Sequence, residues 1–214
     1  MRAIVCHDFP APLRLDEVPA PSVGPGEVAV QVEACGVNFV DGLITTGRYQ
    51  IKPALTHIPG FDVAGVIGEV GQGVDGVAVG DRVFATSGLA GGGYAERVVV
   101  DQSQVFRLPQ SMTLGQGATF VQSYYTALFA LTQRIQLEAG STLLVLGASC
   151  GVWRAAVDIG VALGARVIAG ASSDERLDAC ADIGPHGLIN YGVDDLKTRT
   201  REFSDGGVNV VYDP

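Results

Sequence analysis

The chain has 214 residues, of which 47% are hydrophobic, and it carries a net charge of −9 at pH 7. An acidic chain without a local basic patch repels polyphosphate, so we expect it to bind neither nucleic acid nor an anionic membrane surface. No apolar run is long enough to span a bilayer, and Asp8 and Pro10 interrupt the apolar N-terminus too early for a signal peptide, so a cytoplasmic location is expected.

The cysteines and histidines are few and scattered. Four cysteines lie far apart without a CxxC pair, so neither a disulfide framework nor a zinc knuckle is indicated, and most are expected to be small buried hydrophobes. Three histidines occupy unrelated contexts, and each is expected to be a surface or core residue rather than a catalyst.

The first half of the chain reads as strands and turns. Val28, Val30 and Val32 alternate with less apolar residues, which is typical of a half-buried strand. Three further apolar runs between Gly-rich turns predict strands, and one short segment predicts a helix; the strands cover residues 63–70, 82–85 and 95–100 and the helix residues 39–46. The spacing is typical of a small barrel.

The second half alternates strands with helices. A longer apolar segment, residues 120–131, predicts a helix, and the domain boundary is placed there, giving domains 1–120 and 121–214. The alternation that follows is βαβαβαβ, which right-handed crossovers fold into a doubly wound parallel sheet. The expected strands cover residues 143–146, 167–169, 188–191 and 208–212.

The segment Ser141–Ala156 has the pattern of a nucleotide-binding turn. It is an apolar strand followed by a turn of small residues and a helix, an arrangement that points helix N–H groups at a pyrophosphate.

Several motifs, taken together and in order, resemble one family. They are GPGEV (24–28), ACGVNFVD (34–41), IPGFDVAGV (58–66), VGDRV (79–83), GYAE (93–96), the Gly147 turn and INY (189–191). The chain is similar over its whole length to the zinc-independent quinone oxidoreductases of the medium-chain dehydrogenase/reductase superfamily, the zeta-crystallin-like NADPH enzymes. The resemblance implies a GroES-like N-terminal barrel and a Rossmann sheet, of which only the first half and the start of the second are present.

The resemblance also implies a metal-free reaction. Zinc-dependent relatives have a cysteine where this chain has Asn38 and a histidine where it has Phe61, so two ligands of a catalytic zinc are missing. Zinc-free members are similar in passing a hydride from NADPH to a quinone or an α,β-unsaturated carbonyl. Such acceptors need orientation and a few hydrogen-bond donors rather than a Lewis acid.

The resemblance places Asn38, Asp41 and Tyr49 at the reaction site, with Asn38 also near the cofactor. Each has a structural alternative: Asn38 would cap the helix that follows, Asp41 would pair with a cation, and Tyr49 would simply pack. The implied cofactor contacts also include Thr126, which could instead be an ordinary helical residue, and the turn residues Gly147, Ala148, Gly151 and Val152.

The residues after the second Rossmann strand favour NADPH over NADH. An NAD site has Asp or Glu near this point, whereas this chain has small residues ending in Ser172 and Ser173, which leave room for a 2′-phosphate. Arg176 can supply the positive charge, and Tyr191 matches a family tyrosine that contacts the phosphate. The two serines equally form an ordinary helix N-cap.

An alternative is a catalytically impaired, truncated member that acts as a binding module. Related proteins have glycine where this chain has Cys150 and Trp153, and an indole there is expected to enter the cleft or displace the helix. The family is usually homo-oligomeric, but the strands that form its usual dimer edge are missing here, so the last strand is expected to be unpaired. The sequence identifies neither the electron acceptor nor the oligomeric state.

Overall fold

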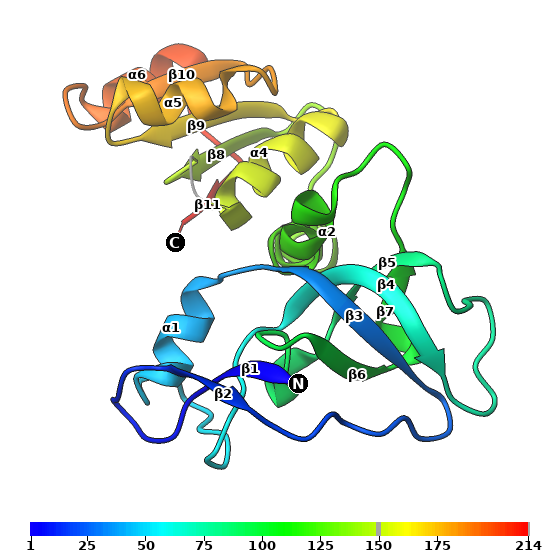
Figure 1. Ribbon diagram of the computed structural model, residues 1–214. Helices are drawn as coiled ribbons and strands as arrows, with labels where there is room; N and C mark the ends of the chain where they lie inside the picture. The colour runs from blue at the N-terminus through cyan, green and yellow to red at the C-terminus, as the bar shows by residue number, and fades with distance from the viewer. Residues whose placement is uncertain (149–150, 214) are drawn as a thin grey trace. The chain divides into compact units, whose positions relative to one another are not determined.

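The computed structural model describes residues 1–148 and 151–213 (Figure 1). The chain divides into two compact units, Met1–Val121 and Gln122–Pro214. Each unit has its own sheet and its own hydrophobic core.

The first unit is built on a five-stranded antiparallel sheet with the strand order β6-β3-β4-β5-β7. The strands are β3 (Glu27–Cys35), β4 (Asp62–Val70), β5 (Arg82–Thr86), β6 (Arg97–Asp101) and β7 (Val105–Arg107). The core contains Val28 and Val30, whose alternation predicted β3, and Val63 from the apolar run that predicted β4, and all three are fully buried. The expected all-β character is therefore confirmed, and the expected helix is α1 (Phe39–Thr45).

Smaller elements complete the first unit. They are the antiparallel pair β1 (Arg2–Val5) and β2 (Arg14–Glu17), the 3₁₀ turns η1 (Gly88–Ala90) and η2 (Gln102–Gln104), and helix α2 (Leu114–Phe120). The pair β1–β2 was not predicted. The reason is that β2 reads RLDE and even its Leu15 is 64% exposed, so no apolar alternation marks it as a strand.

The second unit contains a four-stranded parallel sheet with the order β10-β9-β8-β11. Its strands are β8 (Thr142–Leu146), β9 (Arg166–Ala171), β10 (Gly187–Asn190) and β11 (Val210–Tyr212). This order is the first half of a Rossmann sheet followed by the first strand of the second half, as the sequence predicted.

Helices cover both faces of the parallel sheet. One cluster joins α4 (Gly151–Ala162) and α5 (Asp174–Ala181) to the face that carries Leu143 and Val145. A second cluster joins α6 (Leu196–Phe203) to the face that carries Leu144. Consecutive β8 residues thus pack on opposite faces, as the strand pleat requires.

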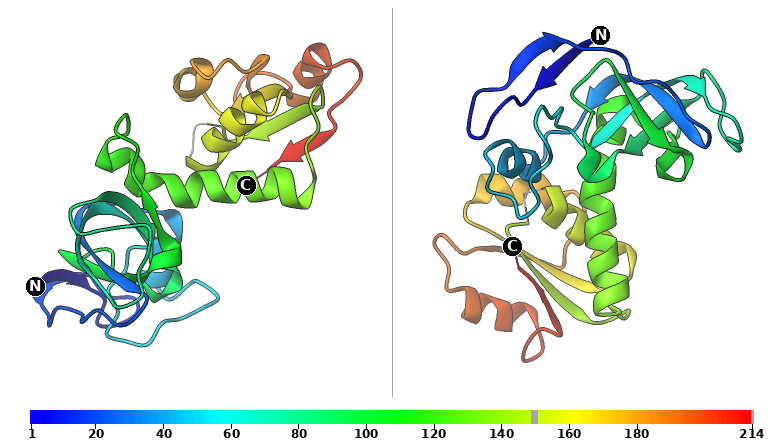
Figure 2. Two further views of the ribbon diagram at one scale, coloured as in Figure 1. Left: turned by 90° about the vertical axis from the view of Figure 1, so that its right-hand side faces the viewer. Right: turned by 90° about the horizontal axis from the view of Figure 1, so that it is seen from below.

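A further helical segment lies along the sheet beside β11 (Figure 2). It consists of η3 (Val121–Tyr125), α3 (Thr126–Phe129) and η4 (Ala130–Arg134), in which η3 and η4 are π-helical turns. Its buried Ala127 and Leu131 join the same core as α4. The helix expected around residues 120–131 is confirmed.

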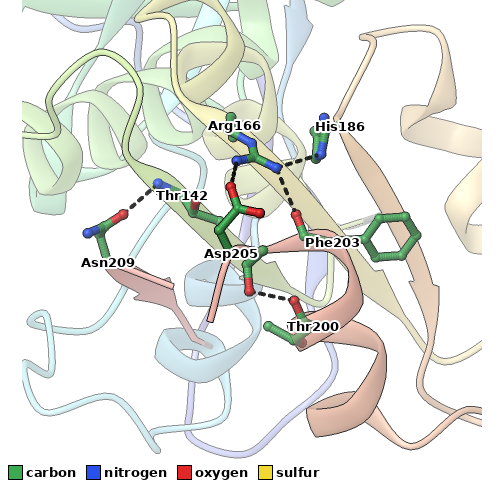
Figure 3. Close-up of polar contacts among 8 residues, drawn as sticks. Thr142, Arg166, His186, Thr200, Phe203, Asp205 and Asn209 are labelled. Carbon is green, nitrogen blue, oxygen red and sulfur yellow. Dashed lines mark hydrogen bonds and ion pairs between the residues drawn. The ribbon is translucent and has the colours of Figure 1, made fainter. Parts of the chain in front are cut away.

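Arg166 ties together the amino ends of this sheet (Figure 3). Its guanidinium donates to the carbonyl of Phe203 at 3.2 Å and to Asp205 at 2.9 Å, and its Nη2 lies 3.1 Å from His186 Nε2. Because arginine can only donate, His186 Nε2 is the acceptor in this contact. Asn209 likewise accepts from the Thr142 backbone at 2.8 Å and thereby links β11 to β8.

Candidate functional site

The nucleotide-binding turn begins directly after β8. Gly147 has a φ of +69°, a left-handed conformation in which other residues are strained, so the turn requires glycine there. The next residue, Ala148, is buried, and its N–H donates to the carbonyl of Gly170 at 3.0 Å, which fixes the turn to the end of β9. Cys150 lies outside the described residues.

Three of the predicted cofactor residues meet where β9 and β10 end. Arg176 Nη1 donates to Ser172 Oγ at 3.1 Å. Tyr191 pairs its N–H with the carbonyl of Ala171 at 3.0 Å, and its ring carbon Cδ1 lies 3.4 Å from where a Cβ on Gly170 would be. Parallel strands place their carboxyl ends at one edge, so these side chains lie on the same edge as the Gly147 turn.

The chemistry of this edge suits an anion. Ser172 and Arg176 are both exposed, and Arg176 forms no ion pair within the described part of the chain. Ser173 caps α5, since its side chain accepts from the backbone N–H of Arg176 at 3.4 Å. The two serines therefore have different roles: Ser173 is the helix cap, and Ser172 orients the arginine.

The start of α4 and the neighbouring helical segment line a cavity of about 450 Å³ within the second unit. Thr126, Val152, Trp153 and Tyr212 are among its walls, so two predicted cofactor residues, Thr126 and Val152, share one cavity. Gly151, the first residue of α4, is exposed, and a Cβ on it would lie 3.0 Å from Ser123 Oγ.

Trp153 is accommodated between this cavity and the core. Its indole is half-buried and packs against the cluster formed by α4 and the sheet, and no hydrogen-bond partner for Nε1 occurs among residues 1–148 and 151–213. The close approach of α4 to the sheet occurs at Gly160, where a Cβ would lie 2.8 Å from Leu143 and 2.9 Å from Val167. The sequence analysis missed Gly160, although a glycine inside a helical pattern is a signal of such packing.

In the first unit, Asn38 and Asp41 lie together at the start of α1. Asn38 is the N-cap residue, as one of its alternatives predicted. Its backbone N–H donates to Asp41 Oδ2 at 2.7 Å, and its half-buried side chain reaches Asp62 Oδ2 at 3.4 Å. The remaining Asp41 oxygen accepts from the backbone N–H of Gly60 at 3.1 Å.

Asp41 is 3% exposed, and both of its oxygens are occupied by backbone donors. Burial raises the pKa of its carboxyl, and the two backbone hydrogen bonds oppose that rise. Burial, helped by the nearby carboxylates of Asp41 and Asp62, raises the pKa of the Cys35 thiol to about 12. Asp41 thus holds the Gly60 turn against α1, and burial together with the carboxylates of Asp41 and Asp62 keeps the Cys35 thiol protonated.

Tyr49 follows α1 and is half-buried; no hydrogen bond of its hydroxyl occurs within residues 1–148 and 151–213. The structure does not bring it into hydrogen-bond contact with Asn38 or Asp41. In the described part of the chain, no group of three or more His, Cys, Asp or Glu side chains is arranged to hold a metal ion. No helix in that part is long and apolar enough to cross a membrane.

His57 is a buried group that the sequence analysis did not single out for a role. Its side chain lies beneath the turn at Gly91, where an added Cβ would come within 2.6 Å of the ring, and its Nε2 has no partner among the described residues. Burial lowers the pKa of His57, while the nearby Asp41 carboxylate opposes that change. The ring is therefore held in its neutral form.

Sequence comparison connects both units to known proteins. Residues 24–110 match the family model of the alcohol dehydrogenase GroES-like domain. The chain is 36% identical over 214 residues to quinone oxidoreductase-like protein 2 from Rattus norvegicus, covering 99% of this chain and 61% of that protein. It is 38% identical over 220 residues to the quinone oxidoreductase of the same organism, covering 100% of this chain and 66% of that protein.

Solved structures give the same result. A probable oxidoreductase from Mycobacterium abscessus superimposes with a TM-score of 0.88 at 36% identity, covering 99% of this chain and 68% of that one. The quinone oxidoreductase from Thermus thermophilus, whose complex with NADPH is also known, superimposes with a TM-score of 0.87 at 33% identity, covering 99% of this chain and 65% of that one. The present chain therefore spans about two thirds of the length of these proteins.

Proposed function

The chain belongs to the quinone oxidoreductases of the medium-chain dehydrogenase/reductase superfamily, and we propose that it acts as an NADPH-dependent reductase of quinones or α,β-unsaturated carbonyls. The observation that carries the cofactor assignment is the contact between Arg176 and Ser172 at the carboxyl end of β9. The relatives supply the reaction class, and the exposed arginine supplies the preference for a phosphorylated cofactor.

The residues present fit a dinucleotide. The left-handed Gly147 turn and the start of α4 offer backbone N–H groups to a pyrophosphate, with Ala148, Gly151 and Val152 beside it. Arg176, oriented by Ser172 and flanked by Tyr191, would hold the 2′-phosphate through charge-assisted hydrogen bonds. Thr126 shares a cavity with Val152 and would contact the nicotinamide. The bound cofactor supplies a hydride from C4 of its nicotinamide.

Residues of the first unit are proposed to bind the electron acceptor. Among the described residues, the Asn38 Nδ2 group donates one long hydrogen bond, 3.4 Å to Asp62, so its second N–H is available to a carbonyl oxygen that gains negative charge as the hydride arrives. The acceptor then takes a proton from solvent. Asp41, with both oxygens engaged by backbone, would act by positioning Asn38, and Tyr49 would contribute to the wall around the acceptor.

We also propose that this reaction proceeds without a metal. At the positions where zinc-dependent relatives carry ligands, the side chains are the amide of Asn38 and the phenyl ring of Phe61. Neither is a ligand that zinc prefers. Quinones and enones are electrophilic enough to accept a hydride when they are oriented beside its donor.

Cofactor titration of the 214-residue chain tests the proposal, with the fluorescence of reduced nicotinamide as the signal. We expect saturable NADPH binding and weaker NADH binding, followed by loss of nicotinamide absorbance when a simple quinone is added. Binding without turnover would instead support the binding-module alternative, and failure to bind either cofactor would refute the assignment of the turn.

A further inference from the structure

Asn190 is a buried polar residue at the carboxyl end of β10 that the proposed reaction does not use. It is 9% exposed, and both ends of its amide are engaged. Its Oδ1 accepts from the backbone N–H of Gly192 at 3.1 Å, and its Nδ2 donates to Asp174 Oδ1 at 2.9 Å. The partners fix this orientation, because a backbone N–H only donates and a carboxylate only accepts. Asn190 thus connects the turn after β10 to the first residue of α5.

These two segments carry the side chains proposed to hold the 2′-phosphate. Tyr191 directly follows Asn190 in the turn after β10. Arg176 lies two residues after Asp174, in the first turn of α5. The separation between the Tyr191 ring and the Arg176 guanidinium therefore depends on how the start of α5 is held against this turn.

The turn after β10 also packs closely on the segment that leads into α5. A Cβ on Gly192 would lie 2.5 Å from the carbonyl oxygen of Ser172, so a larger residue would force the two segments apart. The Tyr191 N–H holds the carbonyl of Ala171 at 3.0 Å. These backbone contacts reach only as far as Ser172, and the bond between Asn190 and Asp174 extends the connection into α5 itself.

Asp174 brings a negative charge close to the proposed phosphate site. Asp174 and Arg176 are both exposed, but among residues 1–148 and 151–213 they form no ion pair with each other. Residues two apart on a helix do not face each other, and each of these two has another partner, Asn190 and Ser172 respectively. The charge of Asp174 by itself would oppose the binding of a phosphate, so a favourable contribution has to come from its hydrogen bond.

We propose that Asn190 and Asp174 are positioning residues that determine the cofactor preference, an inference that rests on the proposed NADPH function. Their hydrogen bond holds the start of α5 against the turn after β10 and so keeps Arg176 and Tyr191 at the separation that a 2′-phosphate requires. NADH lacks this phosphate, so its binding does not depend on that separation.

Two substitutions of Asp174 separate the hydrogen bond from the charge. Asp174→Ala removes both, whereas Asp174→Asn removes the charge and keeps an oxygen that accepts from Asn190. In fluorescence titrations, Asp174→Ala is expected to raise the Kd for NADPH at least about threefold and to change that for NADH less than about twofold. Asp174→Asn is expected to leave the Kd for NADPH unchanged or lower. Asp178→Ala is the matched control, since Asp178 is an exposed acidic residue one turn further along α5, and it is expected not to weaken binding.

An exchange of the two groups tests the pair at constant net charge. Asn190→Asp alone places two carboxylates against each other and is expected to raise the Kd for NADPH at least about threefold. Adding Asp174→Asn reforms the hydrogen bond with the donor on α5, while the new carboxylate at position 190 still accepts from Gly192. The double variant is expected to bind NADPH within about twofold of the wild type. Failure of the double variant to recover would overturn the role of the pair.

Hydrogen exchange of the chain without cofactor gives an independent measurement. Asp174→Ala is expected to exchange faster than Asp174→Asn in residues 172–177 and 190–194, because the two segments are no longer joined. Equal exchange of the two variants, a Kd for NADPH that Asp174→Ala leaves unchanged or lowers, or an equal loss of both cofactors would overturn this inference alone. A wild type that binds neither cofactor would overturn the proposed function and this inference with it.

Discussion

Replacing Arg176 by alanine tests the cofactor assignment most directly. The guanidinium is exposed, is oriented by one hydrogen bond of 3.1 Å from Nη1 to Ser172 Oγ, and has no ion-pair partner in the described part of the chain. A bound 2′-phosphate would therefore gain this positive charge without breaking an existing ion pair. The substitution removes that gain and leaves the fold intact.

The expected magnitude follows from the contacts. A hydrogen bond to a charged group contributes about 1.5–3 kcal/mol, and solvent exposure keeps this one near the lower end. Since about 1.4 kcal/mol corresponds to a factor of ten, the Kd for NADPH is expected to rise ~10- to 30-fold. NADH lacks the 2′-phosphate, so its Kd is expected to change by less than about twofold.

Fluorescence titration with both cofactors at several salt concentrations measures the effect. Arg201→Ala is the matched control. Arg201 is also an exposed arginine of the second unit, but it lies in the last turn of α6, the helix that precedes β11 in the chain. Salt is expected to weaken NADPH binding by the wild type more than by Arg176→Ala. An equal loss of both cofactors, or no loss of NADPH, would refute a phosphate role for Arg176.

Three further predictions concern stability and reactivity. Because burial lowers the pKa of His57, the unfolded chain binds more protons than the folded one, so the free energy of unfolding falls as pH drops below ~6.5. His57→Gln should flatten the dependence of this free energy on pH, as urea unfolding at several pH values can measure. An unchanged dependence would contradict the prediction. With a pKa of about 12, Cys35 should be alkylated about 1,000-fold more slowly in the folded than in the unfolded chain at pH 8. Mass spectrometry measures the two rates, and rapid labelling of the folded chain would disprove the burial argument. Gly160→Val should lower the free energy of unfolding by about 1–3 kcal/mol because its side chain would clash with the sheet. Gly115→Ala, in open space on a helix, should be neutral or stabilising. Equal effects of the two substitutions would count against close packing of α4 on the sheet at Gly160.

The sequence identified the elements whose patterns are local. The alternating valines of β3 and the serine cap before α5 each depend on a few neighbouring residues, and both are present as expected. The order of the parallel strands also followed, because right-handed crossovers leave few topologies for βαβαβαβ. The pair β1–β2 escaped because β2 is polar and exposed, so its pairing depends on a distant partner.

The contacts of individual site residues could not be predicted from the sequence. Asp41 was expected at the reaction site or in a pair with a cation; the structure adds that its oxygens accept from backbone N–H groups of Asn38 and Gly60, the second of which lies 19 residues away. Of the two positions expected for the Trp153 indole, in the cleft or against the sheet, the structure has it lining the cavity with Thr126 and Val152, while Gly160 makes the close contact with the sheet. Such outcomes depend on side chains from several elements and cannot be read from one segment.

The sequence by itself determined the family, the two kinds of sheet and the glycine at the nucleotide-binding turn, because periodicity, crossover handedness and left-handed backbone are properties of short segments. Only the tertiary structure decided that Ser172 orients Arg176, that Asp41 is enclosed by backbone donors, and that Trp153 lines a cavity with Thr126 and Val152. These features arise where segments distant in the chain meet, and their energies depend on distance and burial, which no local pattern specifies.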